Sequence, residues 1–547
     1  MGTFNLIKPF FRKYKLYLLV YSICICLTYP LEAIVIPKIF SDFFENLKGD
    51  VIPDLIFKNF FKKIFIFLII TTISEVCVSK LDIYLIPEFN EIVTNNFFEK
   101  ILKYYENNYT DLELGKMLTR INGIPSVLRE VTTDLFNWIL PKILTIIFIN
   151  MYFYTHDKIL GIGSFSILFL ILYYNINAFK KCVCISNKKY TTFETKSEEL
   201  QDKLSNLYSI YSSGTINSEL DNFKKVSNNF KSIHNESMTC NHNIKTKNSF
   251  FSTLIFITMC CYIVMIYKSS KITKDTLITL FMTLIFYLPC LNTIITYLPD
   301  YTNHLGIIAS LDDFIDDIYE ETEEKPDITV TNGNITITNL NFGYDKSKQL
   351  FNNFNLEINS LDRIAIIGPS GNGKSTLIKL IMGYYQVPLN TIFIDNQDIN
   401  RYNLNSLRKQ ITFINQNTKL FNKSIYDNIK YGNTISNKDI DNIYNKFNLE
   451  RIYKNLIYGF DTIVGVNGDL ISGGQKQIIL LLRNYFKKNK IIILDEPTAA
   501  LDDDTRKTVI EIINIISKNS TLIIITHDEN NLSIVNYKIK LVNGAII

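Results

Sequence analysis

The chain has little charge and none of the usual signs of a nucleic-acid or zinc protein. Only 20% of its 547 residues are charged, and the formal net charge is +4. So small an excess gives no reason to expect a nucleic acid as a partner. The nine cysteines are scattered without zinc-ligand spacing, and Cys182 and Cys184 are too isolated for a cluster. We therefore expect reduced, structural thiols. A cleavable secretion signal and internal repeats are also not evident.

Apolar residues make up 47% of the chain, which favours a membrane protein with a large soluble part. Most of its six long apolar stretches approach the ~20 residues that a helix needs to cross a bilayer. The second stretch is short and soon meets Glu75, Lys80 and Asp82, so we expect it to continue as a helix that leaves the membrane. The six stretches are residues 16–40, 64–78, 135–154, 159–175, 250–267 and 276–297.

The connections between these stretches predict which parts share one side of the membrane. Basic residues between positions 8 and 15 favour a cytosolic N-terminus. Long polar helical arms, residues 98–129 and 198–223, follow the second and fourth stretches, which places them beside a cytosolic C-terminal domain. The acidic residues 312–324 predict a linker helix. We thus expect a six-helix membrane domain over 1–311, a linker over 312–327 and a soluble domain over 328–547.

Two acidic residues, Glu32 and Glu75, lie within or at the edge of the first two apolar stretches. A carboxylate at the membrane centre costs about 2.5 kcal/mol or more, which makes such residues functional candidates. Either residue could instead form a hydrogen bond inside the helix bundle or sit near an interface. Pro30 and Pro37 flank Glu32 and would loosen its helix. One hypothesis is that Glu32 faces a translocation cavity and favours cationic or polar substrates.

A glycine-rich segment in the C-terminal third has the pattern of a phosphate-binding loop. It follows the apolar run 364–367 and precedes a helical pattern over 377–382, as a strand–loop–helix site requires. Glycines let backbone N–H groups close around phosphates, aided by the helix N-terminus. Lys374 would reach the β and γ phosphates, and the Ser375 hydroxyl would bind Mg²⁺. The loop is Gly368, Pro369, Ser370, Gly371, Asn372, Gly373, Lys374, Ser375 and Thr376.

A second motif follows the apolar run 491–494, which is typical of a buried parallel strand and ends in two carboxylates. Asp495 is expected to hold the magnesium ion, and Glu496 to polarise the attacking water. Kinases, GTPases and motors share a phosphate loop, so that loop alone names no function. Together the two motifs predict an ATPase that uses ATP and Mg²⁺.

The residues between and around these motifs resemble the ATP-binding cassette (ABC) proteins. Ile471-Ser472-Gly473-Gly474-Gln475, before an apolar helix, is similar to the family's signature sequence, and Ala500-Leu501-Asp502 to its dimer-facing loop. The resemblance implies that Gln416 binds nucleotide and Mg²⁺, that His527 is the switch histidine, and that Tyr344 stacks on adenine. It also implies that Ser472, Gly473, Gly474 and Gln475 contact nucleotide from a second cassette.

The order of domains resembles an exporter-type ABC half-transporter: an all-α six-helix membrane domain followed by an α/β P-loop NTPase domain. This resemblance implies a multi-pass membrane protein that works as a homodimer or heterodimer and moves an unidentified substrate. Val466 and Asn467 stand where exporters commonly carry Glu and Arg, a departure that bears on coupling. The alternative is an ATP-gated channel, regulator or assembly subunit that does not pump, which Glu496 disfavours. An importer is disfavoured because its membrane and ATPase parts are usually separate chains.

Overall fold

The computed structural model describes residues 2–46, 53–107, 114–319, 325–344, 349–416, 418–453, 456–499, 501–527 and 534–547. The chain folds into two compact units. The first comprises Met1–Lys103 and Asp111–Glu320, and the second comprises Tyr104–Thr110 and Glu321–Ile547. Residues 320–324 of the predicted linker lie outside the described residues, whereas its first part continues the last helix of the first unit.

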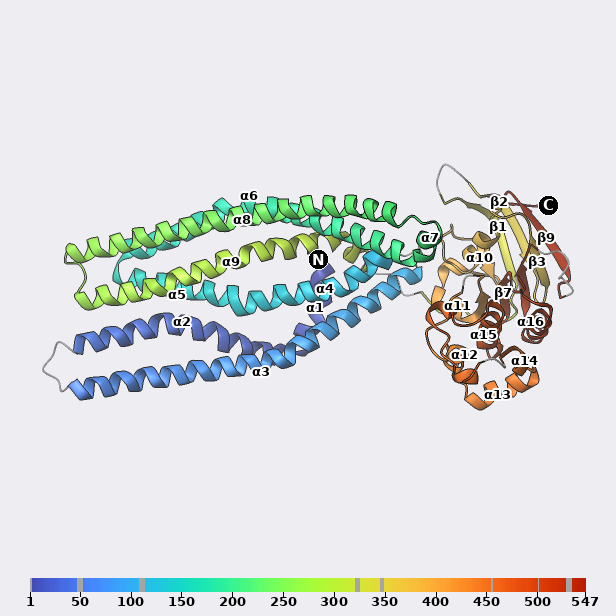
Figure 1. The fold of residues 1–547 in the computed structure, drawn as a ribbon, viewed down its shortest axis with the longest axis horizontal. Coiled ribbons are helices and arrows are strands. Elements are labelled where there is room, and N and C mark those ends of the chain that lie inside the picture. The colour runs from blue at the N-terminus through green and yellow to red at the C-terminus, as the bar shows by residue number, and fades with distance from the viewer. Residues whose placement is uncertain are drawn as a thin grey trace. The chain divides into compact units, whose positions relative to one another are not determined.

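The first unit is built of helices, several of them long and running side by side (Figure 1). Helices α4 and α5 follow each other as one helical segment, joined by the short π-helix η1. The bounds are α1 Gly2–Lys13, α2 Lys15–Asn46, α3 Pro53–Asn107, α4 Leu114–Asp134, η1 Leu135–Ile139, α5 Leu140–His156, α6 Lys158–Ser205, α7 Leu207–Ser212, α8 Ile216–Lys268 and α9 Lys274–Tyr319.

Five helices within the described residues are long and apolar enough to cross a membrane, judged by length and composition. They are Lys15–Asn46, Asp54–Glu106, Gly115–His156, Ile216–Lys268 and Lys274–Leu311. The second predicted stretch does continue as one helix beyond Glu75, since α3 extends to Asn107. The sixth predicted span, residues 159–175, lies in α6, and several of its side chains between 167 and 174 are outside the described part of the structure.

The predicted arms are helical extensions that contact one another, although residues 108–113 of the first arm lie outside the described residues. A Cβ atom added to Gly115 would come within 2.8 Å of the Cα atom of Glu198, so glycine allows α4 to approach α6 closely. One turn further, the Arg120 guanidinium donates two hydrogen bonds, of 2.7 and 3.0 Å, to the buried Glu194 carboxylate. Such bidentate pairs are geometrically specific and fix the register of the two helices.

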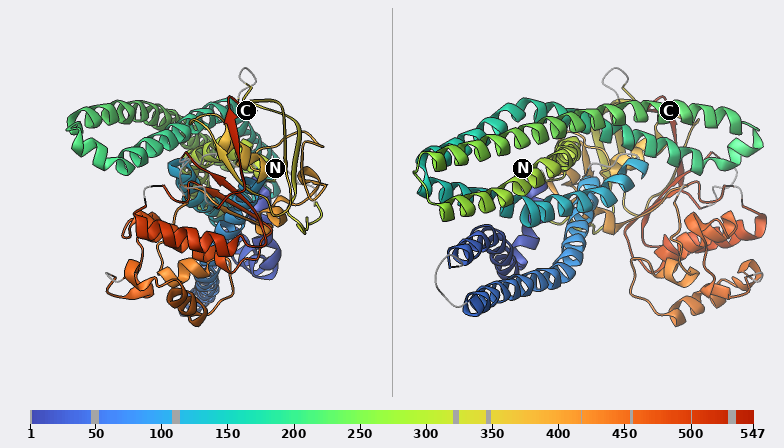
Figure 2. Two further views of the ribbon diagram at one scale, coloured as in Figure 1. Left: turned by 90° about the vertical axis from the view of Figure 1, so that its right-hand side faces the viewer. Right: turned by 60° about the vertical axis from the view of Figure 1, so that its left-hand side comes forward.

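Helices α6 and α8 run alongside each other (Figure 2). A disulfide between Cys182 and Cys240 joins them. The prediction that Cys182 is a reduced thiol is therefore wrong. The two cysteines are 58 residues apart, and only the pairing of the two helices brings their Cα atoms to 5.7 Å. The other seven cysteines, including Cys184, are free thiols as predicted.

The second unit is an α/β domain with two sheets. The larger has six strands in the order β10-β9-β3-β8-β7-β6, and β6, β7, β8, β3 and β9 are parallel. The smaller is antiparallel, in the order β2-β1-β4-β5. The strands are β1 Ile335–Phe342, β2 Phe351–Ile358, β3 Arg363–Ile367, β4 Ile392–Ile394, β5 Gln397–Asp398, β6 Ile411–Ile414, β7 Ile491–Asp495, β8 Thr521–Ile525, β9 Tyr537–Val542 and β10 Ala545–Ile546.

Two hydrophobic cores lie on the two faces of the six-stranded sheet, so its central strands are apolar on both sides. Within β7, for example, Ile493 belongs to one core and Ile492 to the other. The helices are α10 Lys374–Ile381, α11 Leu404–Gln410, α12 Ile425–Lys430, α13 Asn437–Lys446, α14 Glu450–Tyr453, α15 Gly473–Tyr485 and α16 Asp503–Ile516, with short 3-10 turns η2 Ile399–Arg401, η3 Gly459–Asp461 and η4 Val466–Gly468. The strand order places the C-terminal ends of β3 and β7 on the same edge of the sheet, with β8 between them.

Candidate nucleotide-binding site

The predicted phosphate loop connects β3 to α10, in the strand–loop–helix order that the sequence predicts. Gly368 has φ 153°, and a Cβ atom there would come within 2.2 Å of the Leu541 carbonyl oxygen. Gly373 caps α10 in the left-handed region, with φ 96°. Both positions require glycine, because a side chain would clash or strain the backbone. The loop can therefore present backbone N–H groups to an anion at the start of α10.

The side chain of Lys374 folds back over this loop. Its ammonium donates hydrogen bonds to the carbonyl oxygens of Gly368, at 2.7 Å, and Pro369, at 2.9 Å. Burial lowers the pKa of Lys374, and the nearby carboxylates of Glu496 and Asp495 oppose this shift. The ammonium is thus held inside the loop, where it can turn from the carbonyl oxygens to a bound phosphate.

Asp495 is the last residue of β7 and lies opposite the first turn of α10. The Ser375 hydroxyl donates a hydrogen bond of 3.4 Å to the Asp495 carboxylate. Burial, and then the like charge of Glu496, raise the pKa of Asp495, while the Ser375 hydrogen bond and Lys374 act in the opposite direction. The two oxygen groups expected to hold Mg²⁺ therefore lie side by side.

Glu496 lies between two other predicted site residues. Its carboxylate accepts a hydrogen bond of 3.2 Å from the Gln416 amide, and its other oxygen lies 3.2 Å from His527 Nε2. Glu496 has φ 50°, in the left-handed region that residues with a side chain rarely adopt. Such backbone strain is concentrated at functional sites. The chain thus assembles one carboxylate, one amide and one imidazole from three separate loops.

Tyr344 reaches the site from the end of β1, in the four-stranded sheet. Its hydroxyl shares a hydrogen bond of 2.8 Å with the Thr376 hydroxyl, and its ring contacts Phe342 and Tyr385. A cavity of about 500 Å³ lies between these groups. It is lined by Tyr344, Gln349, Leu350, Ser370, Gly371, Gly373, Lys374, Ser375, Thr376, Gln416, Asp495, Glu496, Ile525 and His527.

Most residues that were predicted to contact nucleotide from one chain line this cavity. Three lining residues, Gln349, Leu350 and Ile525, were missed. Gln349 and Leu350 follow the Tyr344 segment without belonging to a motif, and Ile525 is one of many isoleucines in buried strands. The sequence carries no signal that would distinguish them.

The predicted signature residues begin α15 and are not among the residues that line the cavity. Ser472 caps this helix: its hydroxyl accepts a hydrogen bond of 3.2 Å from the Gln475 N–H, and the Gln475 side chain accepts one of 2.9 Å from the Ser472 N–H. A Cβ atom on Gly474 would lie 2.8 Å from the Thr505 side chain. This capping box satisfies the N–H groups of Ser472 and Gln475 and fixes the start of α15.

The oxygen atoms beside the phosphate loop suit Mg²⁺ that is also bound by substrate phosphates, and they are too few to hold a metal by protein ligands alone. No group of three or more His, Cys, Asp or Glu side chains suited to a metal is found within the described ranges. Mg²⁺ prefers oxygen ligands and is commonly held by one or two carboxylates together with substrate phosphates. Ser375, Asp495 and the neighbouring Gln416 supply such oxygen atoms beside the phosphate loop.

Two regions linked to dimer contacts and coupling are only partly described. Ala500 of the predicted dimer-facing loop lies outside the described residues, whereas Asp502 caps α16 by accepting a hydrogen bond from the Thr505 N–H. Val466 is exposed, and the Asn467 carbonyl oxygen accepts a hydrogen bond of 3.0 Å from Lys476. The departure at 466–467 therefore lies at the surface of this unit.

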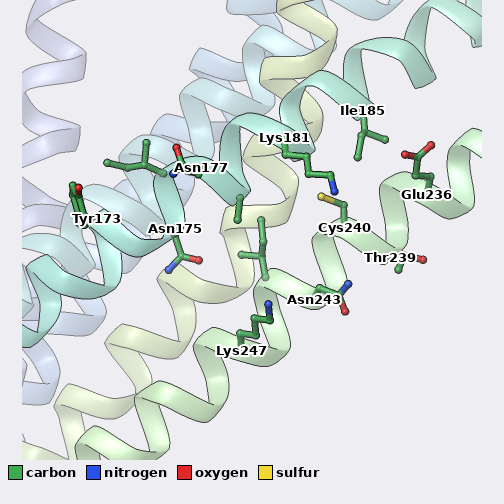
Figure 3. Close-up of a pocket in the computed structure, with 13 residues that line it drawn as sticks. Tyr173, Asn175, Asn177, Lys181, Ile185, Glu236, Thr239, Cys240, Asn243 and Lys247 are labelled. Atoms are coloured by element: carbon green, nitrogen blue, oxygen red, sulfur yellow. The ribbon is translucent and has the colours of Figure 1, made fainter.

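A second, larger cavity of about 890 Å³ lies between α6 and α8 of the helical unit (Figure 3). Residues of 173–185 form one wall and residues of 236–247 the other, and Cys240 of the disulfide is among them. Lys181 and Lys247 share this lining with one acidic residue, Glu236. The cavity thus offers more basic than acidic groups, among apolar side chains such as Ile185 and Ile244.

Comparisons with known proteins show what this chain is similar to. Residues 351–499 match the family model described as ABC transporter. The mitochondrial iron–sulfur clusters transporter ATM1 of Candida albicans is 42% identical over 146 residues, which is 26% of this chain and 20% of that protein. An uncharacterized ABC transporter ATP-binding protein of Bacillus subtilis, YwjA, is 28% identical over 390 residues, which is 69% of this chain and 65% of that protein. The chain spans about a fifth of the length of the mitochondrial relatives it matches.

The fold has a wider match. A solved structure of a bacterial Atm1-family ABC exporter with ATP bound has a TM-score of 0.88, and the match covers 96% of this chain and 94% of that one, at 20% identity. The predicted fold class and the predicted multi-pass membrane protein are confirmed. Residues 351–499 thus resemble the ABC transporter family, and the chain as a whole has the fold of that bacterial ABC exporter.

Proposed function

We propose that this chain is an ATP-hydrolysing exporter half-transporter that works as a dimer. The observation that carries the proposal is one cavity in which Lys374, Ser375 and Asp495 lie beside Glu496 and its two hydrogen-bonding neighbours. Phosphoryl transfer needs a positioned phosphate, a metal site and a group that orients water. The residues of this cavity supply all three.

The roles follow from the chemistry of each group. Lys374 leaves the carbonyl oxygens of its loop and binds the β and γ phosphates, while the loop N–H groups donate to the phosphate oxygens. Ser375, Asp495 and Gln416 would hold Mg²⁺, which would neutralise part of the phosphate charge. The Glu496 carboxylate accepts a proton from the attacking water, and His527 holds that carboxylate in position. Tyr344 offers its ring to the adenine base.

One chain does not complete such a site, because Ser472 and α15 are not among the residues around the cavity. We propose that the signature segment of a second chain closes it, with Ser472 and Gly474 facing the γ phosphate. Nucleotide bound between two cassettes would favour the closed dimer, and hydrolysis would favour its opening. This cycle would expose a membrane cavity alternately to the two sides.

The substrate named for a relative does not identify the substrate of this chain. The match to the Candida albicans protein covers 146 residues, about a quarter of this chain, and the family match lies in the ATP-binding domain at 351–499. The name of that relative describes its own substrate. The structural match extends over the membrane helices, but at 20% identity it supports the fold alone.

Reconstituted protein in liposomes separates a pump from a channel, regulator or assembly subunit. We expect vanadate-sensitive ATP hydrolysis that a transported compound stimulates, and accumulation of that compound against its gradient only while ATP is present. Nucleotide-dependent flux that never exceeds equilibrium would establish the channel instead.

Mixing two inactive variants tests the shared site. In a dimer that combines a Ser472→Arg chain with a Glu496→Gln chain, one site collects both changes and the other keeps a normal Ser472 and a normal Glu496. We expect the mixture to recover part of the ATP hydrolysis that each variant alone lacks. Hydrolysis by a protein proven to be a monomer would contradict the proposal.

A further inference from the structure

Charged side chains from three membrane helices lie at a similar depth in the helical unit. Asp42 near the end of α2 forms an ion pair of 3.0 Å with Lys63 of α3, which marks one end of this hairpin. Glu32 lies about 15 Å along α2 from Asp42, at 1.5 Å per residue, and Glu75 about 18 Å along α3 from Lys63. Lys142 lies about 21 Å along α5 from its last residue. Measured from the Asp42–Lys63 pair, Glu32 and Glu75 thus lie at about half the thickness of a hydrocarbon core of about 30 Å.

The Lys142 ammonium rests on the face of Tyr29, 3.7 Å from the ring centroid. Tyr29 and Glu32 are three residues apart on α2 and therefore share one side of the helix. The Glu32 carboxylate lies within electrostatic range of both Lys142 and Glu75. An aromatic face beside carboxylates is the arrangement that proteins use to bind ammonium groups. Here that position is occupied by a cation that belongs to the chain itself.

The two carboxylates have no directly bonded partner among the described residues. Within the described ranges, neither the Glu32 nor the Glu75 carboxylate takes part in a hydrogen bond or an ion pair, so the alternative that they hydrogen-bond inside the bundle is not supported. Both residues remain partly or fully accessible from the surface of the unit. Charges at this depth are retained where they face a water-filled cavity or a ligand. Two carboxylates and one ammonium leave the cluster with an excess of one negative charge.

Further aromatic rings extend the wall. Tyr297 of α9 lies within electrostatic range of Tyr29, and its ring stacks on Trp138 with centroids 5.6 Å apart. Trp138, the single tryptophan of the chain, lies in the π-helix η1, and π-helical turns are frequent at functional sites. The added residue of such a turn changes the direction in which the side chains after it point.

We propose that Tyr29, Glu32 and Glu75 bind the cationic group of a transported organic cation, and that Lys142 is a tethered competitor that leaves the Tyr29 face when the substrate enters. The inference rests on the proposed transport function, since it assigns the substrate class of that transporter. Lys142 covers the Tyr29 ring in the empty state, and the substrate cation replaces it there.

The test is equilibrium binding of radiolabelled tetraphenylphosphonium to the full chain in lipid nanodiscs, with tetraphenylborate as an anion of the same shape. We expect the cation to bind more tightly than the anion, and Glu32→Gln to weaken its binding at least tenfold. Lys142→Met removes the competitor and should tighten binding severalfold. Glu32→Asp should retain most of the affinity, which controls for misfolding, and Asp42→Asn, an equivalent charge removal at the end of the same helix, should change nothing.

Equal binding of the cation by wild type and by well-folded Glu32→Gln would overturn the proposal. So would tighter binding of tetraphenylborate that is lost in Lys142→Met, because Lys142 would then be an anion site. Binding needs no turnover, so the two proposals fail separately. Absence of ATP hydrolysis with charge-selective binding refutes only the transport function. Normal basal hydrolysis with binding that ignores charge refutes only the cation site.

Discussion

Replacing Glu496 with glutamine is the most direct test of the hydrolytic site. In the structure one carboxylate oxygen accepts from Gln416 and the other lies 3.2 Å from His527 Nε2. An amide of the same shape has one acceptor, so it can satisfy only one of these two donors. It also cannot take a proton from water. The variant should therefore bind ATP but hydrolyse it far more slowly.

The expected loss has two parts. A general base contributes at least about 10²-fold, which corresponds to about 2.7 kcal/mol of activation free energy. The lost positioning hydrogen bond adds about 1 kcal/mol, or roughly fivefold. Steady-state ATP hydrolysis and equilibrium binding of labelled ATP measure turnover and affinity separately. Glu511→Gln, the same change on the exposed side of α16, is the matched control. Hydrolysis by Glu496→Gln within a few-fold of wild type would refute the assignment.

Three other predictions concern the phosphate loop, the metal site and the disulfide. Lys374→Ala should weaken nucleotide binding itself, because the loop loses its one charge for the β and γ phosphates; an unchanged dissociation constant for ATP would contradict this. Burial and Glu496 raise the pKa of Asp495 above its ordinary value of 3.8, and Mg²⁺ binds only the ionised carboxylate. The Mg²⁺-dependent part of the ATP affinity should therefore be complete above the raised pKa. It should fall as the pH drops through that pKa. Asp495→Asn should have weaker Mg²⁺ dependence at every pH, and a wild-type profile flat to pH 4 would exclude the shift. Maleimide labelling of unfolded protein should find seven thiols without reductant and nine with it, because Cys182 and Cys240 are paired, and nine in both cases would exclude the disulfide.

The nucleotide site could be predicted from sequence because its determinants are local. A loop between a strand and a helix needs glycine where the backbone turns back on itself, as at Gly368 and Gly373, and these requirements leave a fixed pattern in the chain. The order of the motifs then indicated which distant residues meet, and Asp495, Gln416 and His527 do line one cavity. Their placement follows from parallel strands whose C-terminal ends share one edge of the sheet.

Features that depend on contacts between long helices were not predicted. Cys182 and Cys240 carry no spacing signal, because their pairing depends on the register of α6 against α8. The π-helix η1 has no sequence mark that distinguishes it from an ordinary helical turn. Hydropathy identifies an apolar span but not which of its sides faces another helix, so side-chain neighbours across the bundle are decided by packing alone.

Glu32 illustrates the boundary between these two cases. Its position in an apolar stretch indicates a functional residue, because a carboxylate is costly in hydrocarbon. Its chemistry, however, depends on Tyr29 one turn away and on Lys142, which lies 110 residues further along the chain and reaches Tyr29 only because α5 packs against α2. The sequence predicted an acidic residue without naming its partner, whereas the structure supplies an aromatic face already covered by an ammonium group. That pairing turns a general expectation of polar substrates into a specific competition between Lys142 and a substrate cation for the same ring.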